Sequence, residues 1–143
     1  METKPLIVEC TYHAPIEKVW EAITDRDQMK EWYFELEEFK AEKGFKFQFT
    51  GGDEKEQYLH VCEVLFVDEP NKISYTWTYP EHNTGYSVVS WELFKEGEQE
   101  TRLKLSHEGL DSFPKDHPNF AVASFTAGWT FIIGESLKKY LET

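Results

Sequence analysis

The sequence predicts an α+β fold in which a curved antiparallel sheet of six to seven strands wraps around one long C-terminal helix. Several segments between residues 45 and 108 alternate apolar and polar residues with a period of two, which is typical of strands. Turn residues separate these segments, so neighbouring strands are expected to be antiparallel. The last apolar segment repeats at every fourth residue, namely at Phe125, Trp129, Ile133, Leu137 and Leu141, which indicates a helix. A sheet followed by a single long helix is α+β.

The N-terminal part predicts one strand and two short helices. Apolar residues alternate with mostly polar ones over Leu6–His13, which indicates a strand. A helix is expected to start at Ala14-Pro15 and to run to about Thr24, because proline suits the first helical turn. Asp25 is a suitable cap for a second short helix from Arg26 to about Glu31.

The middle of the chain predicts a meander of strands. Strands are expected at Phe45–Thr50, Gln57–Val67, Lys72–Tyr79, Tyr86–Phe94 and Thr101–Glu108. Turns are expected at Gly51–Asp53, Asp68–Asn71, Pro80–Gly85 and Glu96–Glu100. A loop rich in turn residues, from Gly109 to Pro118, precedes the last helix.

The composition is that of one acidic domain, expected to span residues 1–143. The chain carries 15 Lys and Arg against 27 Asp and Glu, a formal net charge of −12, and 16% of its residues are aromatic. Each aromatic side chain buries roughly 150–250 Å², so we expect a core that needs no disulfide or metal. A negative field repels phosphate backbones and anionic headgroups. Nucleic acid and a polybasic membrane anchor are therefore excluded.

Cysteine and histidine spacing predicts neither a metal nor another cofactor. Cys10 and Cys62 lie in expected strands, where buried free thiols are expected, although a single bridge between them stays open. The five histidines form no HExxH, HxH or Cys/His pair at ligand spacing. The N-terminus has no signal-peptide pattern, and no apolar run approaches the ~20 residues of a membrane span. We therefore expect a cytoplasmic protein that does not insert into membranes.

Four segments in order resemble one branch of a known superfamily. They are Ala14–Asp25 with Trp32 behind it, Glu63–Trp77, Thr101–Gly109, and Gly128-Trp129. Together they resemble the activator of Hsp90 ATPase homologue-like branch of the START-like, or SRPBCC, helix-grip superfamily. The segments span nearly the whole chain, and no single one would suffice.

The resemblance implies a deep apolar pocket between the C-terminal helix and the concave sheet, which various members use for hydrophobic ligands. It does not imply one reaction. The family often has a double glycine before the second hairpin strand, where this chain has Lys43-Gly44. The strand that follows is rich in Phe, which is expected to narrow or reshape the pocket. The eukaryotic namesakes carry this domain fused to a second, chaperone-binding domain, and we expect no such second domain here.

Aromatic residues on the expected inner faces are the strongest functional signal. Buried tyrosine hydroxyls and indole N–H groups seek hydrogen-bond partners. Such side chains suit a pocket that combines π-faces with a few donors and takes planar aromatic or lipid-like ligands. The alternative is that they form plain core. The expected pocket lining comprises Trp32, Phe47, Phe49, Tyr75, Trp77, Trp91, His107, Phe125, Trp129 and Ile133.

His107 is the one histidine expected to face the concave side of the sheet. It shares the strand phase of Leu103 and Leu105. There it either takes part in acid–base chemistry or is held by partners in a structural role. The sequence shows no Ser/His/Asp triad, no G-x-S-x-G, no GxGxxG and no Walker loop. We therefore assign no catalytic residue.

Three functions follow as hypotheses. The first is non-catalytic binding of a hydrophobic small molecule, either lipid-like or planar aromatic and polyketide-like, in the cavity. The second is a module for stress response or for interaction with an Hsp90-type chaperone ATPase, which rests on the resemblance and the acidic surface. The third is a cyclase or dehydratase-type enzyme using the same cavity. That enzyme would need His107 or Tyr75 in the cavity, with a partner that tunes its pKa.

Overall fold

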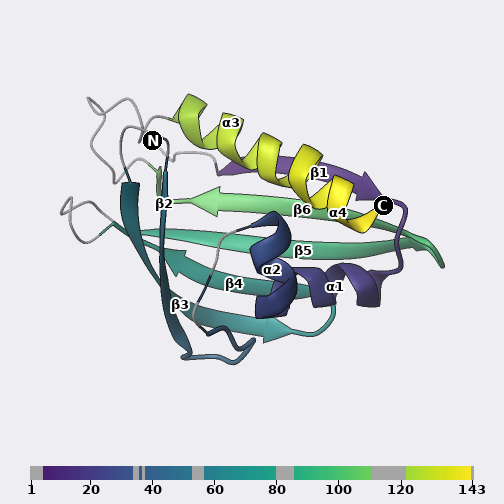
Figure 1. Cartoon of the computed structure of the whole chain (residues 1–143), viewed down its shortest axis with the longest axis horizontal. Helices are drawn as coiled ribbons and strands as arrows, with labels where there is room; N and C mark the ends of the chain where they lie inside the picture. The colour runs from purple at the N-terminus through teal and green to yellow at the C-terminus, as the bar shows by residue number, and fades with distance from the viewer. Residues whose placement is uncertain are drawn as a thin grey trace.

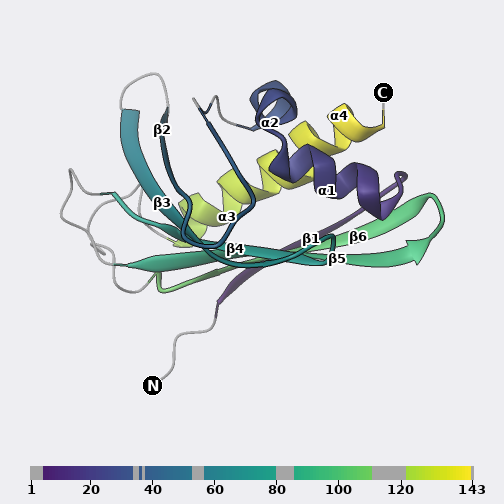
Figure 2. The same cartoon turned by 90° about the horizontal axis from the view of Figure 1, so that it is seen from below.

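A computed structural model describes residues 5–33, 36, 38–52, 57–79, 86–110 and 122–142. It contains one antiparallel six-stranded sheet with the strand order β1-β6-β5-β4-β3-β2. The helices lie on one face of this sheet (Figures 1 and 2). The predicted α+β class and the predicted number of strands are confirmed. The strands are β1 (Leu6–Tyr12), β2 (Lys46–Gly52), β3 (Gln57–Asp68), β4 (Lys72–Trp77), β5 (Ser87–Gly97) and β6 (Glu100–Glu108).

Two expected turns differ from the structure. Gly51 and Gly52 continue β2, because Gly51 pairs with Tyr58 of β3 and Gly52 with Gln57. The prediction of a turn that starts at Gly51 was therefore wrong. Strand β5 extends to Gly97, so the acidic turn expected at Glu96–Glu100 is shorter than predicted. The turn expected at 80–85 and most of the expected loop at 109–118 lie outside the described residues.

The sheet curves toward the helices. A register shift interrupts the pairing of β3 with β4 between Val64 and Phe66. Such bulges bend a strand and increase its twist. Figure 2 shows β2 and the adjoining end of β3 rising on the same side of the sheet as the last helix. The concave face formed in this way is the one that the helices cover.

The helices follow the predicted order. Helix α1 covers Ile16–Thr24, and α2 covers Arg26–Trp32, where the Asp25 side chain accepts from the Asp27 N–H as the expected cap. The last helix runs through α3 (Val122–Phe131), a π-helical segment η4 (Ile132–Leu137) and α4 (Lys138–Leu141). No helix in the described ranges is long and apolar enough to cross a membrane.

The π-helical segment is tied to two other elements. The buried Tyr12 hydroxyl of β1 donates to the Ile133 carbonyl at 2.7 Å. The Ser136 hydroxyl donates to the Trp32 carbonyl at the end of α2, at 2.6 Å. These bonds connect the middle of the last helix to the sheet edge on one side and to α2 on the other.

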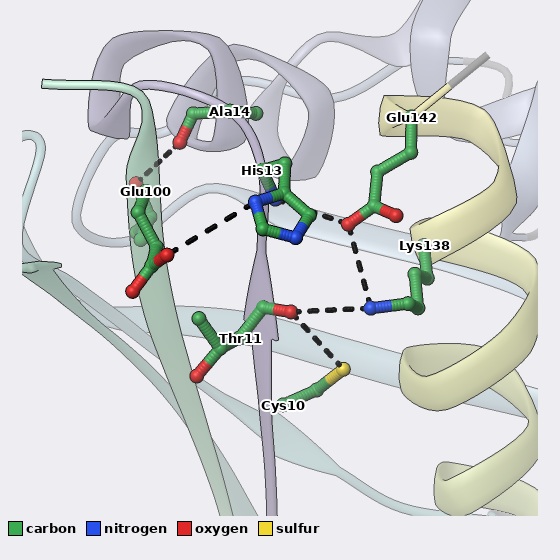
Figure 3. Close-up of polar contacts among 8 residues, drawn as sticks. Cys10, Thr11, His13, Ala14, Glu100, Lys138 and Glu142 are labelled. Atoms are coloured by element: carbon green, nitrogen blue, oxygen red, sulfur yellow. Dashed lines mark hydrogen bonds and ion pairs between the residues drawn. The ribbon is translucent and has the colours of Figure 1, made fainter. Parts of the chain in front are cut away.

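The C-terminal end of the last helix is tied to the corner after β1 (Figure 3). The His13 backbone N–H donates to the Glu142 carboxylate at 3.0 Å. Lys138 pairs with the same carboxylate at 3.4 Å and donates to the Thr11 carbonyl at 3.4 Å. The pKa of Glu142 is lowered, first because its carboxylate accepts this backbone bond and second because Lys138 is near. The helix is thus fixed at its end as well as in its middle.

Both cysteines are free thiols. Cys62 is fully buried, as predicted, and this burial raises the pKa of its thiol. Cys10 is only half-buried. The bridge that the sequence left open does not form.

We expect Tyr12→Phe to lower the free energy of unfolding by about 1–3 kcal/mol, because the buried Ile133 carbonyl loses its hydroxyl partner. Urea unfolding measures the change. Tyr140→Phe removes the same atom from a tyrosine whose hydroxyl bonds to the Gln28 side chain near the surface, so its loss should stay below about 1 kcal/mol. Equal losses in the two variants would contradict the anchoring role of Tyr12.

Candidate functional site

A cavity of about 600 Å³ lies between the last helix, the end of α2 and strands β2 to β4. This volume is within the range of small-molecule sites, roughly 300–1,000 Å³. Aromatic side chains form most of its wall, and each of the three regions contributes at least two of them. The lining consists of Glu31, Trp32, Tyr33, Gly51, Tyr58, His60, Trp77, Tyr79, Ser124, Phe125, Gly128, Trp129, Phe131, Ile132 and Ser136.

The structure brings four of the residues named from the sequence into this lining: Trp32, Trp77, Phe125 and Trp129. The others are buried in the core, outside the lining. They are Phe47, Phe49, Tyr75, Trp91, His107 and Ile133. Phe49 touches a separate, polar hollow beside Arg26 and Lys30. The Phe-rich strand β2 therefore fills the space behind the cavity, where Phe49 stacks on the His60 ring at 4.5 Å between ring centres.

Sequence reasoning missed several lining residues. Tyr58 and His60 share the inward phase of Cys62 in β3, and Tyr79 shares that of Trp77, so extending the alternation would have found them. Tyr33 has no such signal, because it follows the end of α2 in an irregular conformation. Its ring nevertheless stacks on Trp32, with 5.0 Å between ring centres.

The three indoles of the lining donate within the protein. Trp32 donates to the Ala22 carbonyl at 3.0 Å, and Trp77 donates to the Tyr79 hydroxyl at 2.7 Å. Trp129 donates to His107 Nδ1 at 3.1 Å. The sequence had suggested indole N–H groups as donors for a ligand. In the folded chain these bonds instead fix the orientation of the rings, and the rings offer the cavity their carbon edges and faces.

The hydroxyl of the lining residue Tyr33 is linked to two buried residues behind the wall, Tyr75 and Trp91. The Tyr33 and Tyr75 hydroxyls lie 3.1 Å apart, and the Trp91 indole donates to the Tyr75 hydroxyl at 2.9 Å. Burial raises the pKa of both phenols, because a phenolate would be desolvated there. Both hydroxyls therefore stay protonated at neutral pH. Tyr75 is held by its partners outside the cavity lining, which does not favour a catalytic role.

His107 is fully buried beneath Trp129, on the concave side as predicted. An indole N–H can only donate, so Nδ1 of His107 accepts and Nε2 carries the proton. Nε2 then donates to the Ser87 hydroxyl at 2.9 Å, and that hydroxyl donates to the Trp77 carbonyl at 2.6 Å. Burial lowers the pKa of His107 to about 3. Both ring nitrogens of His107 are thus hydrogen-bonded to residues of the cavity wall or behind it. This arrangement supports a structural role for His107 rather than an acid–base role.

His60 is the histidine of the cavity lining. Its Nδ1 lies 2.9 Å from the Tyr58 carbonyl, and because a carbonyl can only accept, Nδ1 carries the proton. Burial lowers its pKa to about 4, although backbone carbonyls of Tyr58 and Phe49 favour the charged form. The ring is neutral at physiological pH and packs edge-on against Trp77, with 4.9 Å between ring centres. His60 therefore adds neutral aromatic surface to the lining, and the carboxylate there is that of Glu31.

Comparison with known proteins identifies the type of domain. The family model described as Activator of Hsp90 ATPase homolog 1-like protein matches residues 13–142. A search of curated proteins found no significant match. Many solved structures do match the fold.

Three of these structures illustrate the range of sequence identity and coverage. DynU16, a protein of the dynemicin biosynthetic locus, has a TM-score of 0.77 and 27% identity over 99% of this chain. That match covers only 48% of DynU16. MLL2253 from Mesorhizobium loti has a TM-score of 0.77 and 26% identity, covering 97% of both chains. An HSP90 activator from Plasmodium falciparum has a TM-score of 0.67 and 20% identity, covering 94% of this chain and 91% of that one, and so shows the fold alone.

We expect acid to destabilise the protein through His107. Its folded-state pKa of about 3 lies below the ordinary value of 6.5, so the unfolded chain binds an extra proton between these pH values. Stability is then full above pH 6.5 and falls as the pH drops toward 3. This histidine alone contributes a slope of up to ~1.4 kcal/mol per pH unit.

Urea unfolding of the wild type and of His107→Gln at pH 7 and pH 5 isolates this slope, since other groups titrate in both proteins. The variant should be less stable at pH 7 and should lose less stability on acidification. His13→Gln, at a histidine whose side chain is 76% exposed, is the matched control and should keep the wild-type slope. An unchanged slope in His107→Gln would show that the histidine is not held neutral in the fold.

Proposed function

The chain belongs to the family of Activator of Hsp90 ATPase homolog 1-like proteins, and on that basis we propose that it binds a hydrophobic small molecule in the cavity without catalysing a reaction. The observation that supports this most is the cavity of about 600 Å³ with its mostly aromatic lining. Ligand sites are typically apolar, with few polar groups. A cavity of this size with a mostly aromatic lining favours ligands that bind by removing apolar surface from water and by contacts between rings.

A planar aromatic ligand suits the wall better than a lipid-like one. Aromatic rings pair with one another in offset or edge-to-face geometries that are worth about 0.5–1.5 kcal/mol beyond burial. Such arrangements already occur within the wall, where Tyr33 stacks on Trp129 with 6.4 Å between ring centres and His60 lies edge-on to Trp77 with 4.9 Å. DynU16, a protein of the dynemicin biosynthetic locus, shares this fold at 27% identity. The ring contacts of the wall support an aromatic, polyketide-like ligand.

Binding without catalysis is supported by the state of the titratable groups. His107 lies outside the cavity lining with both ring nitrogens bonded, and His60 is neutral because burial lowers its pKa to about 4. A general acid or base works best with a pKa near the working pH. Neither histidine satisfies this condition, so the cyclase hypothesis has the weaker support.

A role at a chaperone is the second function to test. Its support is the family description and the shared fold with an HSP90 activator. Stimulation of the ATPase of an Hsp90-type chaperone by the purified protein would favour it. An ATPase rate that stays unchanged at physiological salt would count against it.

We expect the uncharged fluorescent probe N-phenyl-1-naphthylamine to bind in the cavity with a rise in its emission. Phe131 lines the cavity and is 60% exposed, so Phe131→Ala should weaken binding several-fold. Because this side chain is mostly exposed, the free energy of unfolding should change by less than about 0.5 kcal/mol. Fluorescence titration and urea unfolding measure the two quantities.

Phe66→Ala is the matched control, since Phe66 is 48% exposed and does not line the cavity. It should leave probe binding unchanged. Absence of probe binding to the wild type would contradict the proposed function. Equal weakening in both variants would place the binding site elsewhere.

A further inference from the structure

We infer that Gly128 determines which ligands the cavity admits, because its missing Cβ leaves a slot in which a flat aromatic molecule lies against the backbone of α3. This inference rests on the proposed function and adds to it the shape of the ligand and the residue that selects it. It makes Gly128 a specificity-determining residue.

Gly128 faces the cavity from the middle of α3. It is part of the lining, together with Ser124 one turn before it and Ile132 one turn after it. Residues four apart lie on the same face of a helix. The cavity therefore runs along this face of α3, and Gly128 is the smallest of these three residues.

Gly128 is exposed, and the space in front of it is open. A Cβ placed on this residue meets no heavy atom within 4 Å. Close packing of the helix on the sheet therefore does not require glycine here, and neither does the backbone, which is helical. Glycine is nevertheless one of the poorest helix formers. What the residue provides is unoccupied volume beside the backbone, which allows a ligand to approach closely.

The opposite wall of the cavity belongs to the sheet and is aromatic. Tyr58 and His60 of β3 and Trp77 at the end of β4 contribute to it, with Tyr79 just beyond. These rings pack against one another, with 4.7 Å between the ring centres of His60 and Tyr79, and this packing restricts their movement. A ligand beside Gly128 has helix backbone on one side and the rings of the sheet wall on the other. Such a space favours a planar molecule over a puckered or branched one of the same size.

The test combines substitutions at Gly128 with a matched glycine in the same helix. A Cβ placed on Gly134 also meets no heavy atom within 4 Å, and Gly134 does not line the cavity. We expect Gly128→Leu to weaken N-phenyl-1-naphthylamine binding at least about tenfold, because the added side chain occupies the slot. Gly134→Leu should bind like the wild type. Circular dichroism and thermal unfolding establish that each variant is folded.

Gly128→Ala keeps the proposal falsifiable if the leucine variant does not fold, because alanine is the better helix former and meets no neighbour. It should weaken binding about threefold or more. Wild-type affinity in Gly128→Ala and Gly128→Leu would overturn the role of Gly128 while leaving the proposed function intact. If the wild type itself does not bind the probe, the proposed function fails, and this inference fails with it.

A competition experiment tests the shape of the ligand separately. The pair 2-naphthol and decahydro-2-naphthol share a carbon skeleton, but only the first is flat. 2-Naphthol should displace the probe from the wild type at a lower concentration than its saturated analogue does. Equal displacement by the two alcohols would overturn the preference for planar ligands.

Discussion

The hydrogen bond from the Trp129 indole to His107 is the contact on which the rest of the site depends. It joins the last helix to β6 at a fully buried point and is continued through Ser87 to the Trp77 carbonyl. The neutral ring of His107 accepts from Trp129 at Nδ1 and donates to Ser87 at Nε2. A charged ring would carry a proton on both nitrogens and could not accept from the indole. The helix is therefore held at a set position over the concave sheet. The cavity is the space that remains beside this contact.

The aromatic content of the chain has two separate roles in this arrangement. Phe47, Phe49 and Tyr75 are buried behind the cavity, where the Phe47 ring contacts the other two. The indoles of the lining are instead oriented by hydrogen bonds, such as that from Trp32 to the Ala22 carbonyl. Small residues on α3 then leave the volume between helix and rings open. An aromatic protein can thus have both a dense core and an open, rigid site.

Most of the fold could be predicted from the sequence, because period-two alternation and the four-residue repeat of the last helix report burial directly. The inward position of His107 followed from the phase of Leu103 and Leu105 in the same way. The site could be predicted only in part. Alternation shows which face of the sheet a residue lies on, but it does not show whether that residue reaches the cavity. Tyr75 and Trp77 share a face, yet only Trp77 lines the cavity. Tyr33 follows a helix end, where no periodicity applies, and the destination of each indole N–H depends on partners distant in the sequence.

The central claim is that a ligand binds among the tryptophans beneath the last helix, and the indole N–H signals of the five tryptophans test it most directly. In a ¹H–¹⁵N NMR titration with 2-naphthol, we expect the largest shifts for Trp32, Trp77 and Trp129, which line the cavity. Trp20, whose indole donates to Glu69 outside this site, should stay in place. Uniform small shifts, or a shift of Trp20 with the three lining indoles unchanged, would contradict the account.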